Sequence, residues 1–185
     1  MGRTSQSISF SRFVIQLITE ATNKNMIEKK LNLLGITLQR PSKTAGSYVP
    51  LVKSGNLVFV SGQLPVEQGS NPLKVMFKGK VGRDISISDG KQAAKLCTIN
   101  ALAHIKDADL NLDDIKRFVK LSGFVNCDAS FSRHPEVING ASDFLVQLFG
   151  EKGKHSRVAV GMSSLPLDSA VEIDFIIEGG NTIEP

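Results

Sequence analysis

The chain has 185 residues, of which 41% are hydrophobic, enough for one domain with its own core and too few for two ordinary domains. The net charge of +4, with one Tyr, no Trp and no basic stripe with interleaved aromatic residues, gives no support for a nucleic-acid interface. No apolar run approaches the ~18 residues of a membrane span, and the two cysteines indicate a reducing compartment rather than a disulfide framework.

Residues 1–25 differ in composition from the rest. They are rich in Ser and Thr and poor in acidic residues, and their apolar stretch FVIQLI is shorter than a secretory segment of ~7 to 15 residues. A loose N-terminal arm, an upstream start in front of Met26 and a mitochondrial-type presequence all fit this composition. We predict a single domain over 26–185 and a cytoplasmic protein, with the mitochondrial matrix as the alternative if residues 1–25 are a presequence.

Regular patterning begins at Met26. MIEKKLNLLG predicts a short helix that Gly35 closes, and QRPSKTAGS predicts a loop. YVPLVK and LVFVSGQLP predict two strands around the turn Ser54-Gly55-Asn56. Because LVFV is apolar at consecutive positions, we expect both faces of the sheet to be covered, one of them by helices and the other by a partner subunit.

The middle of the chain alternates strands and helices. FKGKVG predicts a further strand at the sheet edge, and Ser88 or Asp89 can cap a helix through KQAAKLCTINALAHIKDAD, whose apolar residues share one face. IKRFVKLSGFVNC predicts a strand. A second helix begins at Pro135, which suits a first helical turn, and ends near Gly150 or Gly153.

Two alternating apolar patterns, RVAVGM and VEIDFII, close the chain around a turn at residues 165–167 and predict two strands folded back on each other. The element order is strand, strand, strand, helix, strand, helix, strand, strand. It predicts an α+β two-layer domain with a mixed sheet and two long helices on one face. The other face needs a cover, which favours self-association.

The sequence contains no convincing motif for a metal site, a catalytic nucleophile or a phosphate-binding loop. His104 lies inside a predicted helix, and Cys127, His134 and His155 lack the close pairings of a zinc site. A Cys127/His134 nucleophilic pair has no third orienting group in the sequence. GKVGRD lacks the spacing of a phosphate-binding loop. We therefore expect neither a metal nor a cofactor.

Arg157 and Glu172 are the remaining candidates. Fifteen residues separate them, and a turn between their strands would let both side chains line one end of a hairpin. One interpretation is structural: Arg157 and Glu172 form a salt bridge with each other, or both side chains lie in solvent at the edge of the sheet. The other is a substrate site, because the planar fork of arginine suits bidentate capture of a carboxylate.

Three segments carry a family likeness: YVPLVKSGNLVFVSGQLP, KLSGFVNCDASFSRHPEVINGAS and SRVAVGMSSLPLDSAVEIDFIIE. In order and spacing they resemble the Rid family, also called YjgF or "endoribonuclease L-PSP" proteins, over roughly residues 26–178. MIEKKLNLLGIT and GEKGKHSR resemble a YjgF-like branch rather than the RidA branch. The resemblance implies a chorismate-mutase-like fold and a homotrimer with a ligand cleft between neighbouring subunits.

The resemblance also implies roles for residues in that cleft. Arg157 matches an arginine that grips the carboxylate of a 2-imino acid, and Glu172 matches an acidic residue that positions or activates water. The substrate-binding residues implied by the same match are Tyr48, Ser61, Gly62, Asn139 and Ala159. Ala159 stands where the family often has a cysteine, His155-Ser156 replace its usual Pro-Ala, and residues 66–80 form a longer insertion.

The implied activity is that of an enamine/imine deaminase, a hydrolase that converts reactive 2-imino acids of the 2-aminoacrylate type to 2-oxo acids and ammonia without a cofactor. The expected partners are these small acids and further copies of the chain, with no membrane. Two alternatives stay open. One is a trimeric protein that binds carboxylate metabolites without turnover, and the other is an endoribonuclease, which needs a basic groove that the sequence does not show.

Overall fold

The computed structural model describes residues 25–43 and 46–179. Short 3₁₀ turns lie at Leu112–Asp114, Gly150–Gly153 and Pro166–Asp168. The longer elements are, in chain order, α2 (Met26–Leu33), β1 (Leu51–Ser54), β2 (Leu57–Gln63), α3 (Ile87–Asp107), β3 (Ile115–Asn126), α4 (His134–Phe149), β4 (Ser156–Met162) and β5 (Val171–Gly179).

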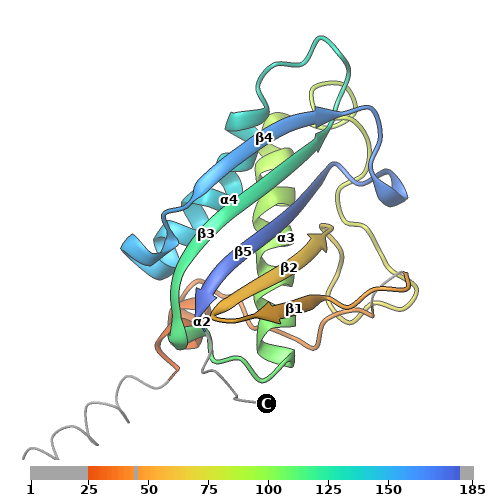
Figure 1. Ribbon diagram of the computed structural model, residues 1–185. Helices are drawn as coiled ribbons and strands as arrows, with labels where there is room; N and C mark the ends of the chain where they lie inside the picture. Colours follow the sequence, from red (N-terminus) through yellow and green to blue (C-terminus); the bar gives the residue numbers. More distant parts are fainter. Residues whose placement is uncertain (1–24, 44–45, 180–185) are drawn as a thin grey trace, which may run out of the picture.

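The five strands form one sheet in the order β1-β2-β5-β3-β4 (Figure 1). Neighbouring strands are antiparallel, except that β3 and β4 run parallel. A parallel pair needs a crossover connection, and α4 supplies it because it lies between these two strands in the chain. β4 is therefore one edge of the sheet, and β1 is the other.

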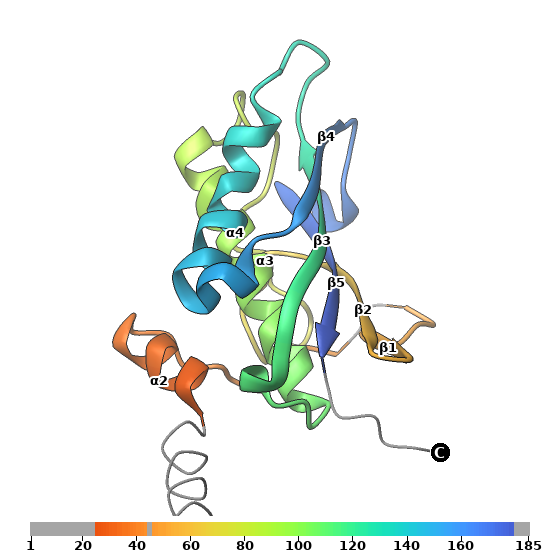
Figure 2. The same cartoon turned by 60° about the vertical axis from the view of Figure 1, so that its left-hand side comes forward.

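The helices α3 and α4 pack side by side against one face of the sheet (Figure 2). Alternate residues of β5 are buried beneath them: Val171, Ile173, Phe175 and Ile177. The α+β prediction, with a mixed sheet and two long helices on one face, is confirmed.

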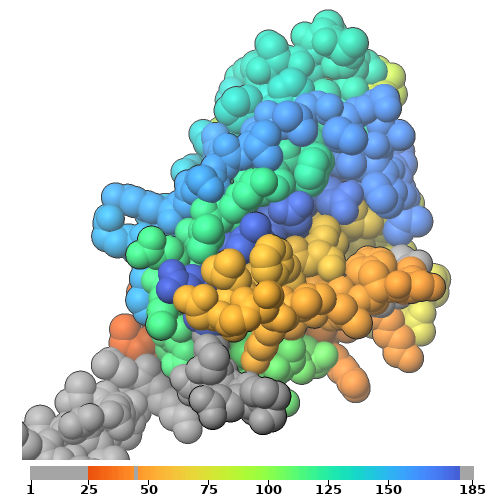
Figure 3. Space-filling view, viewed as in Figure 1, coloured from red at the N-terminus to blue at the C-terminus, as the bar shows by residue number. Residues whose placement is uncertain are grey.

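The opposite face of the sheet carries apolar side chains at the surface. Phe59 is 42% exposed although the residues on either side of it are buried, and on β4 Val158, Val160 and Met162 are also exposed. In Figure 3 this face is turned toward the viewer, and no helix lies over the strands. LVFV is therefore apolar on both faces, as predicted, and the described part of the chain covers only one of them.

The expected edge strand FKGKVG does not form. In this segment Lys78 makes a single bridge to Ser169, and Val81 makes one to Ile85. Gly79 and Gly82 both have positive φ, 100° and 88°, which breaks an extended backbone. The segment is therefore a loop over the ends of the strands.

The helix that follows begins earlier than predicted. Ser86, rather than Ser88 or Asp89, is the N-cap of α3. Its hydroxyl oxygen accepts from the Asp89 backbone N–H at 3.0 Å and donates to the Asp89 carboxylate at 2.7 Å. Asp89 thus completes the cap from inside the first turn, because a residue three positions after the cap can reach back to it.

The predicted pairing of the last two strands is wrong. β4 and β5 are separated by β3, which pairs with both of them. The chain between β4 and β5 turns at Leu167 and Asp168, whose φ values are 55° and 57°, and enters the sheet on the far side of β3. The alternation of apolar residues in each segment indicated two strands. It carries no information on which strands pair with them in the sheet.

The expectations for residues 1–25 lie outside the described residues, apart from Asn25. Within the described ranges, no helix has both the length and the apolar character needed to cross a membrane.

Candidate functional site

Arg157, the second residue of β4, leaves the sheet on the side of the helices. It pairs with Leu121 of β3, a core residue that in turn pairs with Phe175 of β5, and paired residues of neighbouring strands share a face. Its Nη1 donates to Asn139 Oδ1 at 2.8 Å and to Ser142 Oγ at 3.0 Å, both on α4. The structure thus brings together Arg157 and Asn139, as the resemblance implied.

A directed chain of hydrogen bonds supports this arginine. His155 Nδ1 lies 2.7 Å from the Gly153 carbonyl oxygen, which can only accept, so Nδ1 carries the proton. Nε2 then accepts from the Ser142 hydroxyl at 3.0 Å, and the Ser142 oxygen is left to accept from Arg157. The pKa of His155 is lowered, mainly because the side chain is buried. The hydrogen bond to the Gly153 carbonyl raises this pKa, and the charge of Arg157 lowers it. The neutral imidazole is the form that this chain of bonds requires.

Only one of the three nitrogens of the Arg157 guanidinium donates hydrogen bonds to the described residues. Both of its hydrogen bonds leave from Nη1, and within 25–43 and 46–179 no residue accepts from Nε or Nη2 and no carboxylate forms an ion pair with it. The salt bridge to Glu172 that the sequence allowed is therefore not formed inside one chain. An arginine fixed on one side and open on the other can receive a carboxylate through two parallel hydrogen bonds.

Ala159 lies two residues along β4 on the same face as Arg157. It pairs with Gly123 of β3 and packs half-buried against the core. A Cβ at Gly123 would overlap the side chain of Ile138 on α4, so helix and sheet approach each other closely here. Ala159 offers the site a methyl group and no reactive atom.

Glu172, the second residue of β5, points to the opposite face of the sheet. It pairs with Phe124 of β3, and its neighbours along the strand are buried in the core. A Cβ at Gly62 would overlap Glu172 Oε1, so the carboxylate lies directly against the backbone of β2. Burial raises the pKa of Glu172, and the charge of Asp174 raises it further. A carboxylate with a raised pKa is a stronger base than an ordinary glutamate.

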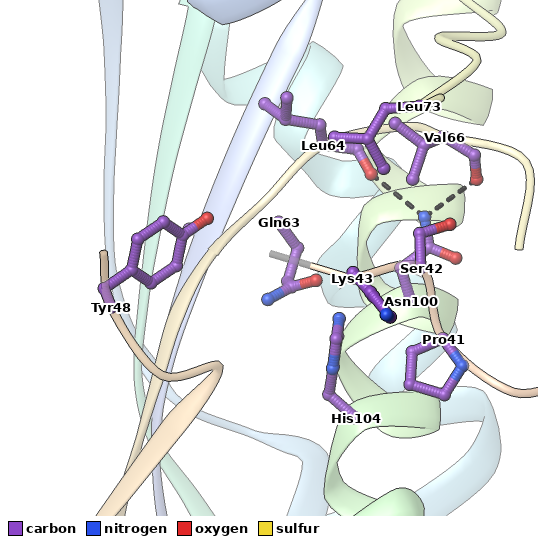
Figure 4. Close-up of a pocket in the computed structure, with 11 residues that line it drawn as sticks. Pro41, Ser42, Lys43, Tyr48, Gln63, Leu64, Val66, Leu73, Asn100 and His104 are labelled. Atoms are coloured by element: carbon purple, nitrogen blue, oxygen red, sulfur yellow. Dashed lines mark hydrogen bonds between the residues drawn. The ribbon is translucent and has the colours of Figure 1, made fainter. Parts of the chain in front are cut away.

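The segment before β1 is fastened beside Gly62. The Ser61 hydroxyl donates to the Val49 carbonyl at 2.8 Å, and this brings the neighbouring Tyr48 to the end of β2. Tyr48 and Gly62 line the same small hollow. Figure 4 labels Tyr48 at this hollow. Gly62 therefore lies against Glu172, Ser61 is next to Gly62 in the chain, and Tyr48 precedes the residue that Ser61 holds.

The candidate residues fall into two groups. The arginine group contains Arg157, Asn139 and Ala159, and the glutamate group contains Glu172, Tyr48, Ser61 and Gly62. Arg157 and Glu172 point to opposite faces of the sheet, with β3 between their strands. The expectation that these two side chains line one end of a hairpin is wrong.

Two residues of the arginine group were not found from the sequence. Ser142 and His155 complete the hydrogen-bond chain behind Arg157. The spacing of Asn139 and Ser142, three residues apart and so on one face of a helix, was the available signal. His155 had no such signal, because its contact with α4 depends on the crossover from helix to strand.

Cys127 and His134 do meet, with Sγ and Nε2 3.3 Å apart beside a hollow of about 410 Å³. Burial raises the pKa of the Cys127 thiol, so the thiol is protonated at neutral pH. Among the residues that the structure describes, none hydrogen-bonds to the other ring nitrogen of His134, and no group of three or more His, Cys, Asp or Glu could hold a metal ion. The pair thus lacks the orienting group that a nucleophilic dyad uses.

Comparison with known proteins agrees with the fold and the motifs. The chain matches the family described as "YjgF/chorismate_mutase-like, putative endoribonuclease" over residues 28–178. The chain belongs to the YjgF family. This match confirms the resemblance that the sequence motifs showed.

Relatives of this YjgF-family protein come from distant organisms. "Protein TCP17" of Trypanosoma cruzi is 38% identical over 156 residues, which covers 84% of this chain and 95% of the relative. The crystal structure of Atu1372 from Agrobacterium tumefaciens, a protein "with unknown function", is 42% identical with a TM-score of 0.79, over 89% of this chain and 99% of that one. A "putative endoribonuclease" from Shewanella oneidensis is 35% identical with a TM-score of 0.76, over 82% and 98%.

Proposed function

We propose that this YjgF-family protein is an enamine/imine deaminase that hydrolyses 2-imino acids of the 2-aminoacrylate type to 2-oxo acids and ammonia. The observation that carries the proposal is the state of Arg157. Its Nη1 is fixed by Asn139 and Ser142, while Nε and Nη2 have no acceptor among the described residues. This arrangement suits a small carboxylate ligand, because a planar guanidinium can give two parallel hydrogen bonds to a carboxylate.

The arginine and glutamate groups can act on one substrate only if they come from different copies of the chain. Each group lies on its own face of the sheet, and the exposed apolar face offers a surface on which copies can pack. The proposal therefore includes a homotrimer with a cleft between neighbouring subunits, as the family resemblance implies. Arg157 of one copy would then face Glu172 of the next.

The chemistry needs positioning and proton transfer. The guanidinium of Arg157 holds the carboxylate, and the imine carbon then lies in the cleft opposite Glu172. Glu172 accepts a proton from a water molecule as its oxygen bonds to the C=N carbon. The nitrogen gains protons, the C–N bond breaks, and ammonia leaves as the C=O bond forms. The raised pKa of Glu172 favours this proton transfer.

A carboxylate-binding protein without turnover is the second candidate, and Ala159 favours it. This position offers only a methyl group beside the guanidinium, so the arginine group could bind an acid without further chemistry. Endoribonuclease activity is named in the family description but has no basic groove in the sequence to support it.

The direct test is the lifetime of freshly generated 2-iminopropionate in the presence of the purified full chain. We expect catalytic concentrations to shorten this lifetime, with equal amounts of pyruvate and ammonia formed. An unchanged lifetime together with measurable pyruvate binding would support the binding protein instead. Cleavage of a single-stranded RNA under the same conditions, without imine hydrolysis, would support the ribonuclease.

A further inference from the structure

The hydrogen bonds of Arg157 leave one edge of its guanidinium open. Nη1 carries two hydrogens and has two acceptors, Asn139 Oδ1 at 2.8 Å and Ser142 Oγ at 3.0 Å. The edge between Nη1 and Nη2 is therefore closed to a ligand. At the other edge Nε–H and one hydrogen of Nη2 point in the same direction, and neither has an acceptor within residues 25–43 and 46–179. Two parallel hydrogen bonds to a carboxylate are possible only there.

The Ser142 oxygen accepts from Arg157 because its own proton is directed to His155. His155 Nδ1 donates to the Gly153 carbonyl at 2.7 Å, so Nε2 is left as an acceptor, and the Ser142 hydroxyl donates to it at 3.0 Å. The lone pairs of Ser142 Oγ then point to Nη1 of Arg157. His155 thus acts on Arg157 through Ser142.

A serine inside a helix has another choice, which this arrangement excludes. Its hydroxyl can turn back to the carbonyl four residues earlier, as the hydroxyl of Thr98 on α3 does with the Ala94 carbonyl at 3.1 Å. For Ser142 that turn would carry Oγ away from Arg157 and free a hydrogen of Nη1. The acceptor that His155 offers keeps the Ser142 hydroxyl in the other orientation.

His155 is itself held in a fixed place. Its acceptor, the Gly153 carbonyl, belongs to the 3₁₀ turn that follows α4. A Cβ at Gly153 would overlap the Leu145 carbonyl, so this turn packs directly on the backbone of α4. On the other side, the Ser156 hydroxyl donates to the Val119 carbonyl of β3 at 2.8 Å. The start of β4 is therefore tied both to the helix and to the sheet.

The open edge decides the direction in which the rest of a ligand lies. Carboxylates on the two edges of a planar guanidinium extend in directions roughly 120° apart, yet both make two charge-assisted hydrogen bonds and bind with similar strength. Only one of these directions can bring the imine carbon opposite Glu172 of the next copy. A misplacement of about 1 Å can lower the rate about a hundredfold, so the choice of edge matters for turnover more than for affinity.

We propose that Ser142 and His155 are positioning residues that confine the substrate carboxylate to the Nε–Nη2 edge of Arg157. This inference rests on the proposed function, because it concerns the acid that Arg157 would hold. It deepens that function by separating two tasks. Arg157 supplies the affinity for the acid, and the bonds behind it set the orientation of the acid toward Glu172.

Kinetics separate orientation from affinity. Ser142→Ala frees a hydrogen of Nη1, so a carboxylate can also bind at the Nη1–Nη2 edge. For 2-iminopropionate we expect kcat to fall at least about threefold while KM stays equal or falls, because part of the substrate binds in an unproductive orientation. His155→Phe, which removes only the acceptor for the Ser142 proton, should act in the same direction, and Ser142→Thr should retain most of kcat. A raised KM with unchanged kcat would overturn the inference, since it indicates lost affinity alone.

Nuclear magnetic resonance of the Arg157 side chain reports the occupied edge without turnover. A carboxylate at the Nε–Nη2 edge accepts from Nε–H and moves its proton signal downfield, whereas one at the Nη1–Nη2 edge does not. The signal is assigned by its absence from Arg157→Lys protein. With saturating pyruvate as the probe, we expect a downfield shift in the wild type and about half of that shift or less in Ser142→Ala. Equal shifts in the two proteins would overturn the inference.

Ser132→Ala, in the exposed loop before α4, is the matched control and should change neither kcat nor the pyruvate shift. A melting temperature lowered by Ser142→Ala, with kcat per folded molecule unchanged, would show a structural role and reject the inference alone. If 2-iminopropionate is not hydrolysed but pyruvate shifts the Nε–H signal of the wild type and not that of Ser142→Ala, the inference stands and catalysis is rejected. No shift in either protein would reject both.

Discussion

Arg157 and Glu172 have different surroundings. Arg157 stands on a hydrogen-bonded chain through Ser142 and His155 that orients it, and part of its guanidinium is open to a ligand. Glu172 is half-buried against Gly62, with no cationic partner among residues 25–43 and 46–179, and burial raises its pKa. In the proposed function, Arg157 holds an anion and Glu172 accepts a proton.

Arg157→Ala should abolish imine turnover while the fold survives. Losing two charge-assisted bonds at a partly desolvated site costs about 2 to 5 kcal/mol, by analogy with interfacial charge pairs. This is ~30-fold to several thousand-fold in rate or affinity. Arg157→Lys should fall between, because an ammonium keeps the charge without the planar fork.

Thermal melting and hydrolysis rate, measured on the same preparation, check this prediction. Arg83→Ala is the control, since Arg83 forms an exposed ion pair with Asp84. A structural role for Arg157 would appear as lost stability with unchanged activity per folded molecule. Full activity in well-folded Arg157→Ala protein would remove Arg157 from the site.

The raised pKa of Glu172 predicts opposite effects of Glu172→Gln on activity and stability. The ionised form is disfavoured in the folded state, so stability falls as pH rises from the unfolded pKa through the folded pKa. That cost is fully present above the folded pKa. Glu172→Gln removes it and should raise the melting temperature, while hydrolysis is lost.

The pH profile gives a second readout. For the wild type, kcat/KM should rise with pH through an apparent pKa above 4.5, the ordinary value for this group. This acid limb should be missing from any residual activity of Glu172→Gln. A less stable Glu172→Gln protein with a normal pH profile would contradict the assignment.

Among the elements, those with local signals could be predicted from the sequence. The β1–β2 hairpin, β3 and both long helices follow from a glycine turn, alternation and helical periodicity. The neighbours of β4 could not be predicted, because the crossover through α4 places β4 beside β3 and leaves β5 on the other side. The motif resemblance named seven candidate site residues, but their division between two faces depends on this pairing. His155 was missed for the same reason, whereas Ser142 had a signal in its helical spacing from Asn139.

A chain that begins at Met26 should keep its melting temperature and its assembly. The Asp113 carboxylate accepts from the backbone nitrogens of Met26 and Ile27, each at 2.9 Å, and fixes the start of α2 to the body. A free amino group at Met26 can make the same bond. Calorimetry and light scattering on the shortened and full chains check this, and a marked loss of either property would show that residues 1–25 contribute.

Asp113→Ala is the companion variant. It leaves both nitrogens without their acceptor and should cost about 1 kcal/mol of unfolding free energy, as for the loss of a helix cap. An unchanged melting temperature for Asp113→Ala would show that α2 is held by its apolar contacts alone.

At the scale of the whole molecule, the exposed apolar face and the divided site point to the same assembly. A surface with Phe59, Val158, Val160 and Met162 at 37% exposure or more is well suited to contact with another copy. The same contact would bring an arginine group against a glutamate group. Assembly and activity should therefore be lost together.

Val160→Lys tests this link. A lysine between Val158 and Met162, on the exposed apolar face of β4, should prevent packing, so we expect a folded monomer by light scattering and circular dichroism, without imine hydrolysis. Val146→Lys, on the outer side of α4, has similar exposure and should change neither property. An active Val160→Lys monomer would show that one chain contains a complete site.

The shared site itself is tested most directly by mixing two inactive variants. Arg157→Ala and Glu172→Gln chains, unfolded together and refolded at equal amounts, form mixed trimers in which some clefts combine an intact arginine group with an intact glutamate group. Random mixing in a cyclic trimer predicts about a quarter of the wild-type rate of 2-iminopropionate hydrolysis, from two parents that have almost none. If native mass spectrometry shows mixed trimers and the mixture is as inactive as its parents, the account of a site built from two copies is wrong.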